Sequence, residues 1–210
     1  MKKVFFLMMM VAVLGITTTS AQGVKFGVTA GLNVSTISGD IENAKYKAGF
    51  QAGVLADLGI TENFSIIPEL LFSQKGGKNE FEEEILGVEV AATSTITLNY
   101  LTIPVNAAYK FNLGQNQKFL IFAGPYVGYG LSTSVGVEVD GTSVETDAVK
   151  FGSGDEEIKA LDFGVNVGVG YQFEKIFFKL QYNLGLSNLS NDKDYSMKNN
   201  NIAVSVGYLF

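Results

Sequence analysis

The stretch Leu161–Phe173, which reads LDFGVNVGVGYQF, alternates between apolar residues and polar or glycine residues at every position. A β-strand points successive side chains to opposite faces, so this alternation predicts a strand that separates two different environments. The apolar face carries Leu161, Phe163, Val165, Val167, Val169, Tyr171 and Phe173. The other face carries Asp162, Asn166 and Gln172 between glycines.

Seven further stretches repeat this period of two, beginning near Val24, Ala48, Phe64, Leu101, Phe119, Ile176 and Ile202. Most have roughly ten residues, the length that crosses a bilayer as a tilted strand. The pattern changes in one place: Leu98 and Tyr100 are in opposite phase to the apolar run that follows them. We interpret this change as a bulge near Asn99–Leu101, or as a strand end that projects beyond the membrane.

The connections between these strands alternate in length. Long ones are expected at 36–46, 75–95, 132–159 and 188–200, and short ones at 59–63, 112–117 and 174–175. Within the third long connection, the alternating valines of 133–139 predict a hairpin extending above the membrane. Long loops on one side and tight turns on the other are typical of outer-membrane barrels. The sequence therefore predicts an all-β fold, an eight-stranded antiparallel up-and-down transmembrane β-barrel.

The composition of the two faces indicates which one meets lipid. An eight-stranded barrel is only wide enough inside for its own side chains. Glycines such as Gly164 and Gly168 on the polar face would leave room there for long Lys, Glu and Gln side chains. We therefore expect the polar face to point inward and the apolar face to contact outer-membrane lipid. A soluble lipocalin-like carrier, with its faces reversed, is the alternative.

The first residues have the order of a secretory signal peptide. Lys2 and Lys3 precede an apolar run from Val4 to Ile16, and small residues lead to Ala21. The run is shorter than the roughly 20 residues of a transmembrane helix, which disfavours the alternative of an uncleaved anchor. We expect residues 1–21 to be a signal peptide and residues 22–210 to be the outer-membrane β-barrel domain.

The composition excludes several function classes. The chain has no cysteine, histidine or tryptophan, and all 15 of its basic residues are lysines. The usual catalytic bases, thiol nucleophiles and nitrogen or sulfur metal ligands are therefore missing. Removing Lys2 and Lys3 from the formal charge of −6 leaves −8, which disfavours nucleic acid as a partner. We expect no enzymatic activity, no cofactor and no metal site.

Charged residues on the inward face are the most informative polar set. They are Lys25, Lys47, Asp57, Glu69, Lys110, Asp162 and Lys179. They could line an ion path, but we favour a self-satisfied network that fills the lumen, because buried charges need partners. A second set lies in the expected loops: Glu80, Glu82, Glu83, Glu84, Asp155, Glu156 and Glu157. These acids could gather Ca²⁺, but such runs are more often solvated loop charge.

Several phrases resemble one known family. The segments PELLFSQKG at 68–76, LNYLTIPV at 98–105 and AGPYVG at 123–128 are together similar to the PorT-like outer-membrane β-barrel family. The resemblance extends over nearly all of the expected mature chain, and it implies a cell-envelope location without catalysis. The last strand ends in Tyr208 and Phe210 on one face. This is similar to the terminal aromatic signal that outer-membrane assembly machinery recognises during insertion.

These features lead to two functional expectations. The first is a non-enzymatic, porin-like envelope protein with a structural role, or with long extracellular loops that contact extracellular or envelope proteins. The second is an accessory component of a type IX-like secretion or envelope assembly machine, because one branch of the PorT-like family is associated with that apparatus. In both, the termini would be periplasmic, since an even number of strands returns the chain to its starting side.

Overall fold

The computed structural model describes residues 23–40, 44–85, 88–139, 142–146, 150–154, 157–192 and 195–210. At residue 44 and at 80–85, 88–91, 139 and 142–146 it describes the backbone alone. The expected signal peptide lies outside the described residues. Among the described residues, no helix is long and apolar enough to cross a membrane.

Eight antiparallel strands close into a ring. In ring order they are β1 (Val24–Gly39), β3 (Lys47–Gly59), β4 (Phe64–Ile85), β5 (Val88–Gly114), β6 (Gln117–Val139), β8 (Leu161–Phe173), β9 (Ile176–Gly185) and β10 (Met197–Leu209). β10 pairs with β1, for example at Val204 opposite Leu32, and this pairing closes the barrel. Two short strands, β2 (Ala44–Lys45) and β7 (Thr142–Thr146), add to the edges of β4 and β6. The predicted fold class is confirmed.

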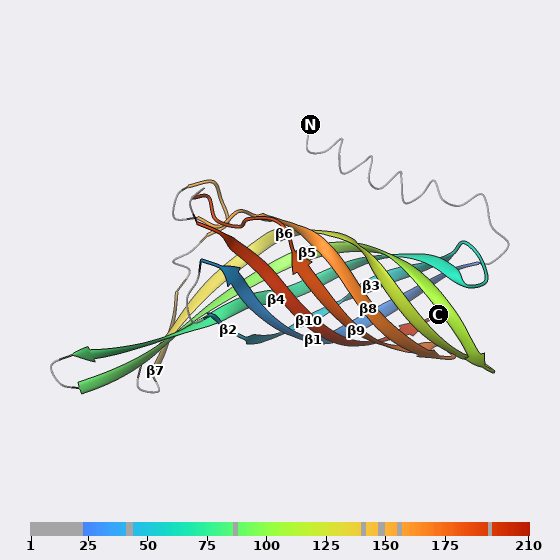
Figure 1. The fold of residues 1–210 in the computed structure, drawn as a ribbon, viewed down its shortest axis with the longest axis horizontal. Helices are drawn as coiled ribbons and strands as arrows, with labels where there is room; N and C mark the ends of the chain where they lie inside the picture. Colours follow the sequence, from blue (N-terminus) through green and yellow to red (C-terminus); the bar gives the residue numbers. More distant parts are fainter. Residues whose placement is uncertain are drawn as a thin grey trace.

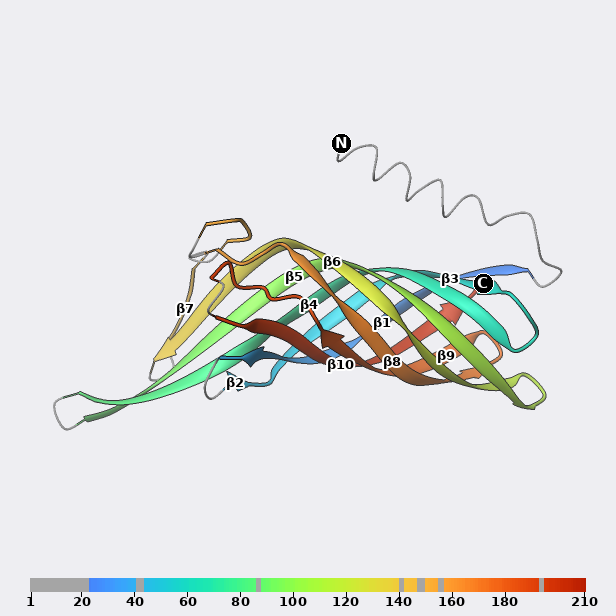
Figure 2. The same cartoon turned by 45° about the horizontal axis from the view of Figure 1, so that its top comes forward.

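The barrel has two different ends (Figure 1). The three short turns and the C-terminus lie at one end, which we call the turn end. The long connections lie at the other, which we call the loop end, and there the β4–β5 hairpin runs far beyond the ring (Figure 2). This sorting of connections matches the expectation from the sequence.

The two faces are also as predicted. Along β8, exposed and buried residues alternate: Val167 is 56% exposed and Asn166 is 3% exposed. Large apolar side chains cover the outside of the ring, including Phe26, Leu32, Val54, Ile121, Phe178 and Val204. Polar side chains fill much of the inside, including Asn33, Gln51, Ser73, Asn106 and Gln181.

Several stretches expected to be loops are strands. β4 continues to Ile85 and β5 begins at Val88, so most of 75–95 is a paired hairpin. β1 likewise reaches Gly39, and β10 begins at Met197. The expectation of loops there is wrong: these stretches are paired strands, but their residues do not alternate between apolar and polar as those of the ring do. The extension predicted for 133–139 is confirmed, since β6 continues to Val139 and pairs with β7.

The predicted bulge exists, but its extra residue lies on the neighbouring strand. Asn99 pairs with Ser132 and Tyr100 with Gly130, so Leu131 of β6 is the additional residue. β5 keeps its phase, and Leu98 and Tyr100 are fully buried on the same inward face as Thr102. The change in the sequence pattern therefore marks apolar side chains that enter the lumen.

Candidate functional site: the lumen of the barrel

Among the described residues, three lysine–carboxylate ion pairs connect non-adjacent strands through the lumen. Lys110 of β5 binds Asp57 of β3 near the turn end. Lys179 of β9 binds Glu69 of β4, with Nζ 2.6 and 2.7 Å from the two carboxylate oxygens. These four residues belong to the set predicted from the sequence, and the structure brings them together as two pairs.

The third pair involves a lysine that the sequence reasoning missed. Lys75 is 1% exposed, and its Nζ lies 3.1 Å from Oδ2 of Asp162. The same ammonium lies 4.5 Å from the ring centroid of Tyr126 and 5.5 Å from that of Tyr100, distances typical of cation–π contacts. The sequence analysis expects Lys75 at the start of the long connection 75–95. Leu71 and Ser73 point into the lumen, and alternate residues of a strand share a face. Continuing the strand by two residues would therefore have placed Lys75 in the lumen as well.

Asp162 is the centre of the polar network on the loop side of the lumen. Its Oδ1 accepts a hydrogen bond from Ser187 Oγ at 2.9 Å and one from Tyr126 Oη at 3.4 Å. Its Oδ2 accepts one from Asn199 Nδ2 at 3.4 Å. A fully buried carboxylate with an ion pair and several donors is satisfied where it lies, as buried charges must be.

Asn106 and Asn166 extend the middle pair across the lumen. Asn106 Nδ2 donates to Glu69 Oε1 at 3.5 Å, and Asn166 Nδ2 donates to Asn106 Oδ1 at 3.3 Å. This chain of side chains links β4, β5 and β8 through the interior. The lumen between the ion pairs is thus crossed by hydrogen-bonded side chains.

Lys25 and Lys47, also predicted for the network, form no ion pair with a described carboxylate. Lys25 is exposed at the turn end, opposite Asp57 in the strand register. Lys47 is 7% exposed at the loop end, where its Nζ donates to the carbonyl of Ala48 at 3.2 Å. Of the seven predicted residues, these two therefore stand apart from the pairs.

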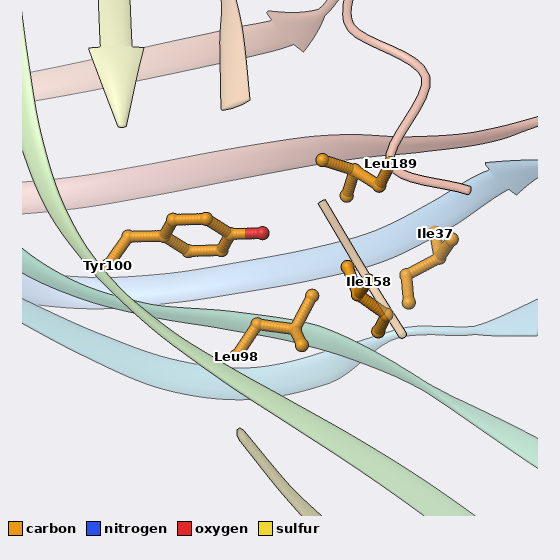
Figure 3. Packing of buried hydrophobic residues seen from close by; sticks show 5 residues of the cluster. All are labelled: Ile37, Leu98, Tyr100, Ile158 and Leu189. Atoms are coloured by element: carbon orange, nitrogen blue, oxygen red, sulfur yellow. The ribbon is translucent and has the colours of Figure 1, made fainter. Parts of the chain in front are cut away.

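An apolar plug occupies the lumen at the loop end. Ile37, Leu98 and Tyr100 from the barrel wall pack against Ile158 and Leu189 from the long connections (Figure 3). Phe151 packs against this cluster, with its ring 5.3 Å from that of Tyr100. The loops thus fold inward over the barrel and supply side chains that close this end. Sequence reasoning did not identify this plug, because Ile158 and Leu189 lie outside any periodic run.

Aromatic rings lie beside several of the inward glycines. A Cβ on Gly168 would lie 2.4 Å from the ring of Phe122, and one on Gly207 would lie 2.1 Å from the ring of Phe177. One on Gly164 would lie 2.7 Å from Tyr126. At Gly164 and Gly168, the expectation that the space is taken by long Lys, Glu or Gln side chains is wrong, because aromatic rings lie there. Phe122 and Phe177 are buried in the lumen, so its lining is partly apolar.

Two neighbouring cavities with shared lining residues lie at the turn end of the part of the chain that the structure describes. One of about 90 Å³ is lined by Lys25, Asp57, Lys110, Lys118 and Gln172, among others. A smaller one of about 30 Å³ shares Asp57 and Gln172 with it and reaches the Glu69–Lys179 pair. We call the larger cavity the vestibule.

The acidic residues of the long connections are the ones for which Ca²⁺ binding was the alternative. The side chains of Glu80 and Glu82–Glu84 and the residues Asp155 and Glu156 lie outside what the structure describes, so the Ca²⁺ alternative stays a prediction. In the described part of the chain, no group of three or more Asp, Glu, His or Cys residues could hold a metal ion.

Tyr208 and Phe210 lie side by side on the outer surface, with ring centroids 5.8 Å apart. Their role as an assembly signal also stays a prediction.

Comparison with known proteins agrees with this architecture. Among solved structures, Neisserial surface protein A matches with 15% identity and a TM-score of 0.50, over 90% of this chain and 100% of that chain. The Yersinia pestis attachment invasion locus protein Ail, solved with the heparin analogue sucrose octasulfate, matches with 14% identity and a TM-score of 0.42, over 90% and 100% of the two chains. No curated protein sequence matches the chain. The family model described as outer membrane protein β-barrel domain matches residues 19–191, and the chain belongs to that family.

Proposed function

We propose that this outer-membrane barrel is non-enzymatic and acts through its loop end, which faces the outside of the cell and binds external or envelope proteins. The observation that carries the proposal is the sheet that extends beyond the ring at that end. It consists of the distal parts of β4, β5 and β6 together with β7. Strands that leave the barrel and remain paired present a rigid surface to partners.

The outer edge of β7 is the most suitable part of this surface. β7 pairs with the end of β6, from Thr142 opposite Val139 to Thr146 opposite Val135. Among the described residues, no strand pairs with the other side of β7. An open edge offers backbone amides and carbonyls to which an extended segment of a partner can add as a further strand. The proposed contact is therefore β-strand addition, with affinity from main-chain hydrogen bonds.

The filled lumen favours this role over that of a channel. Three ion pairs, the asparagine chain and the apolar plug occupy the interior along its length. Eight-stranded barrels have interiors just wide enough for side chains. Function then resides on the exposed surfaces, and the extension is one of these.

The test compares partners captured on intact cells by the full chain and by a variant without the β7 edge. In the variant, residues 136–148 are replaced by a short Asn-Gly turn, which removes β7 and the distal end of β6 but leaves the ring part of β6 in place. After cross-linking and purification in detergent, we expect an interacting protein that the full chain retains and the variant loses. Heat-modifiable migration on a gel verifies that the variant barrel is folded.

Two outcomes oppose the proposal. Identical partner sets for both forms would exclude the β7 edge as the contact. Capture by both forms of a secretion or assembly machine component, bound from the periplasmic side, would favour the accessory role implied by the PorT-like resemblance.

A further inference from the structure

The vestibule at the turn end is lined by an unusual excess of lysines. Lys25 of β1, Lys110 of β5 and Lys118 of β6 line it, together with the carboxylates of Asp57 and Glu62. Three cations against two carboxylates give the vestibule a formal charge of +1, whereas the whole chain carries −6. Among described residues, only Lys110 of the three lysines is in a salt bridge. The vestibule therefore has two ammonium groups available to an anion.

Asp57 has a hydrogen-bonding requirement that the protein leaves unmet. Its Oδ2 is bonded to Lys110, while its Oδ1 is buried and has no partner in the described structure. The residue is 6% exposed and lines the vestibule. A buried acceptor without a donor is costly, and such groups are normally satisfied by water or by a ligand.

Together, these features fit an anion that also carries a hydroxyl donor. We propose that the vestibule binds inorganic phosphate in its protonated form, with oxygens toward Lys25 and Lys118 and a P–OH group donating to Asp57 Oδ1. Hydrogen phosphate retains a proton at neutral pH, whereas sulfate has none and would face Asp57 with lone pairs only. The cavity of about 90 Å³ exceeds the roughly 10–15 Å³ that one water requires, so it accommodates more than a single solvent molecule.

The chemistry predicts selectivity as well as binding. Lysines alone would bind phosphate and sulfate by charge, with little discrimination. A carboxylate acceptor repels the fully deprotonated ion and accepts a hydrogen bond from the protonated one. Asp57 is thus the specificity-determining residue, and Lys25 and Lys118 supply the attraction.

The test uses the protein purified from outer membranes in detergent and titrated calorimetrically at pH 7.5 with sodium phosphate or with sodium sulfate at equal ionic strength. We expect saturable phosphate binding and, because one charge-assisted hydrogen bond is replaced by repulsion, at least roughly tenfold weaker sulfate binding. Methyl phosphate, which is mostly a dianion without a P–OH at this pH and has no other hydroxyl, should resemble sulfate. The titration does not depend on which side of the membrane the vestibule faces, so it is independent of the proposed partner binding.

Variants assign the site. K25Q/K118Q should weaken phosphate binding by at least roughly tenfold, because the variant lacks the two ammonium groups that donate charge-assisted hydrogen bonds to the anion. The matched control K175Q removes a lysine of the same turn end whose side chain lies over the ring of Tyr208, and it should bind phosphate as the unchanged protein does. D57N removes the negative charge and replaces one carboxylate oxygen by an NH2 donor, so it should reduce or abolish the preference for phosphate over sulfate.

The proposal is overturned by several results. These are an absence of saturable phosphate heat, equal affinities for phosphate and sulfate in the unchanged protein, or an equal effect of K175Q and K25Q/K118Q. Should D57N not fold, the phosphate-to-sulfate ratio of the unchanged protein still decides the question.

Discussion

Neighbouring residues of one strand face two different environments in this molecule, the outer surface and the polar lumen. At the centre of β8, Val167 is 56% exposed on the outer surface, and its neighbour Asn166 is 3% exposed and hydrogen-bonded to Asn106. A charge on the outer face meets hydrocarbon, whereas a charge on the inner face can find polar partners. Substitutions one position apart should therefore differ in their effect on stability.

We expect V167K to lower the free energy of unfolding by about 2–4 kcal/mol, the penalty for a charge near the bilayer midplane. N166K should cost less, because the lumen around Asn166 contains Asn106 and the carboxylate of Glu69. Reversible urea unfolding in lipid vesicles measures both. A nearly silent V167K beside a damaging N166K would mean that the two faces have been assigned backwards.

The Lys75–Asp162 pair should stabilise the barrel only while both partners are present. D162N keeps a polar side chain of the same size but leaves a lysine of 1% exposure without its counter-charge. We expect a loss of about 3–5 kcal/mol, as for other broken buried pairs. K75M/D162N removes both charges and should recover part of that loss. The single variant K75M completes the comparison. If the loss of unfolding free energy in K75M/D162N equals the sum of the losses in K75M and D162N, the pair is not coupled.

Phe122 should make Gly168 intolerant of a side chain. A Cβ there would lie 2.4 Å from the Phe122 ring, so G168A should destabilise by about 1–3 kcal/mol through overpacking. Gly128 is the matched control on the same inward face, because its nearest neighbour would lie 3.5 Å away. G128A should leave thermal unfolding, followed by heat-modifiable migration, almost unchanged. Equal effects of the two substitutions would contradict this account of the lumen packing.

At the level of elements, β4, β5 and β6 each consist of a ring part and an extension. The ring parts have one apolar and one polar face, while the extensions pair with one another beyond the plug. Backbone pairing within the extension needs no contact with lipid or with the lumen. The extension should therefore contribute little to the stability of the barrel.

Shortening the β4–β5 hairpin tests this independence. Residues 80–93 can be replaced by an Asn-Gly turn, because Asn79 and Ser94 are already opposite each other in the register. We expect the shortened protein to insert, fold and unfold within a few degrees of the full chain, because no ring contact is removed. Circular dichroism during heating gives the comparison, and a large drop in the midpoint would show that the extension supports the ring.

For the molecule as a whole, closure of an even number of strands places the C-terminus and the short turns at one end. Short turns face the periplasm in bacterial barrels, which predicts that the loop end is extracellular. The chain has no cysteine of its own, so single introduced thiols report on this directly.

We expect E138C, at an exposed position of the extension, to react with an impermeant thiol reagent on intact cells. K175C, at the exposed turn between β8 and β9, should react only after the outer membrane is permeabilised. Gel-shift labelling of both variants before and after permeabilisation measures this. The reverse pattern would invert the orientation, and with it the proposed contact of the β7 edge with external partners.

The sequence by itself determined the number of ring strands, their faces and the sorting of short and long connections. It could do so because lipid on one side and a narrow, largely polar lumen on the other impose a period of two on most residues of the ring. The same pattern placed Asp57, Glu69, Lys110, Asp162 and Lys179 on the inward face.

Only the tertiary structure decided which of these charges meet. The pairs join strands that are far apart along the chain, such as β4 with β9 for Glu69 and Lys179. Partner choice depends on the stagger of the strands around the ring, which no local pattern records. The β4–β5 part of the extension and the plug were not predicted, for related reasons. The residues of 75–95 do not alternate as those of the ring do, and Ile158 and Leu189 reach the lumen through irregular loops whose path depends on the packing of the whole barrel mouth.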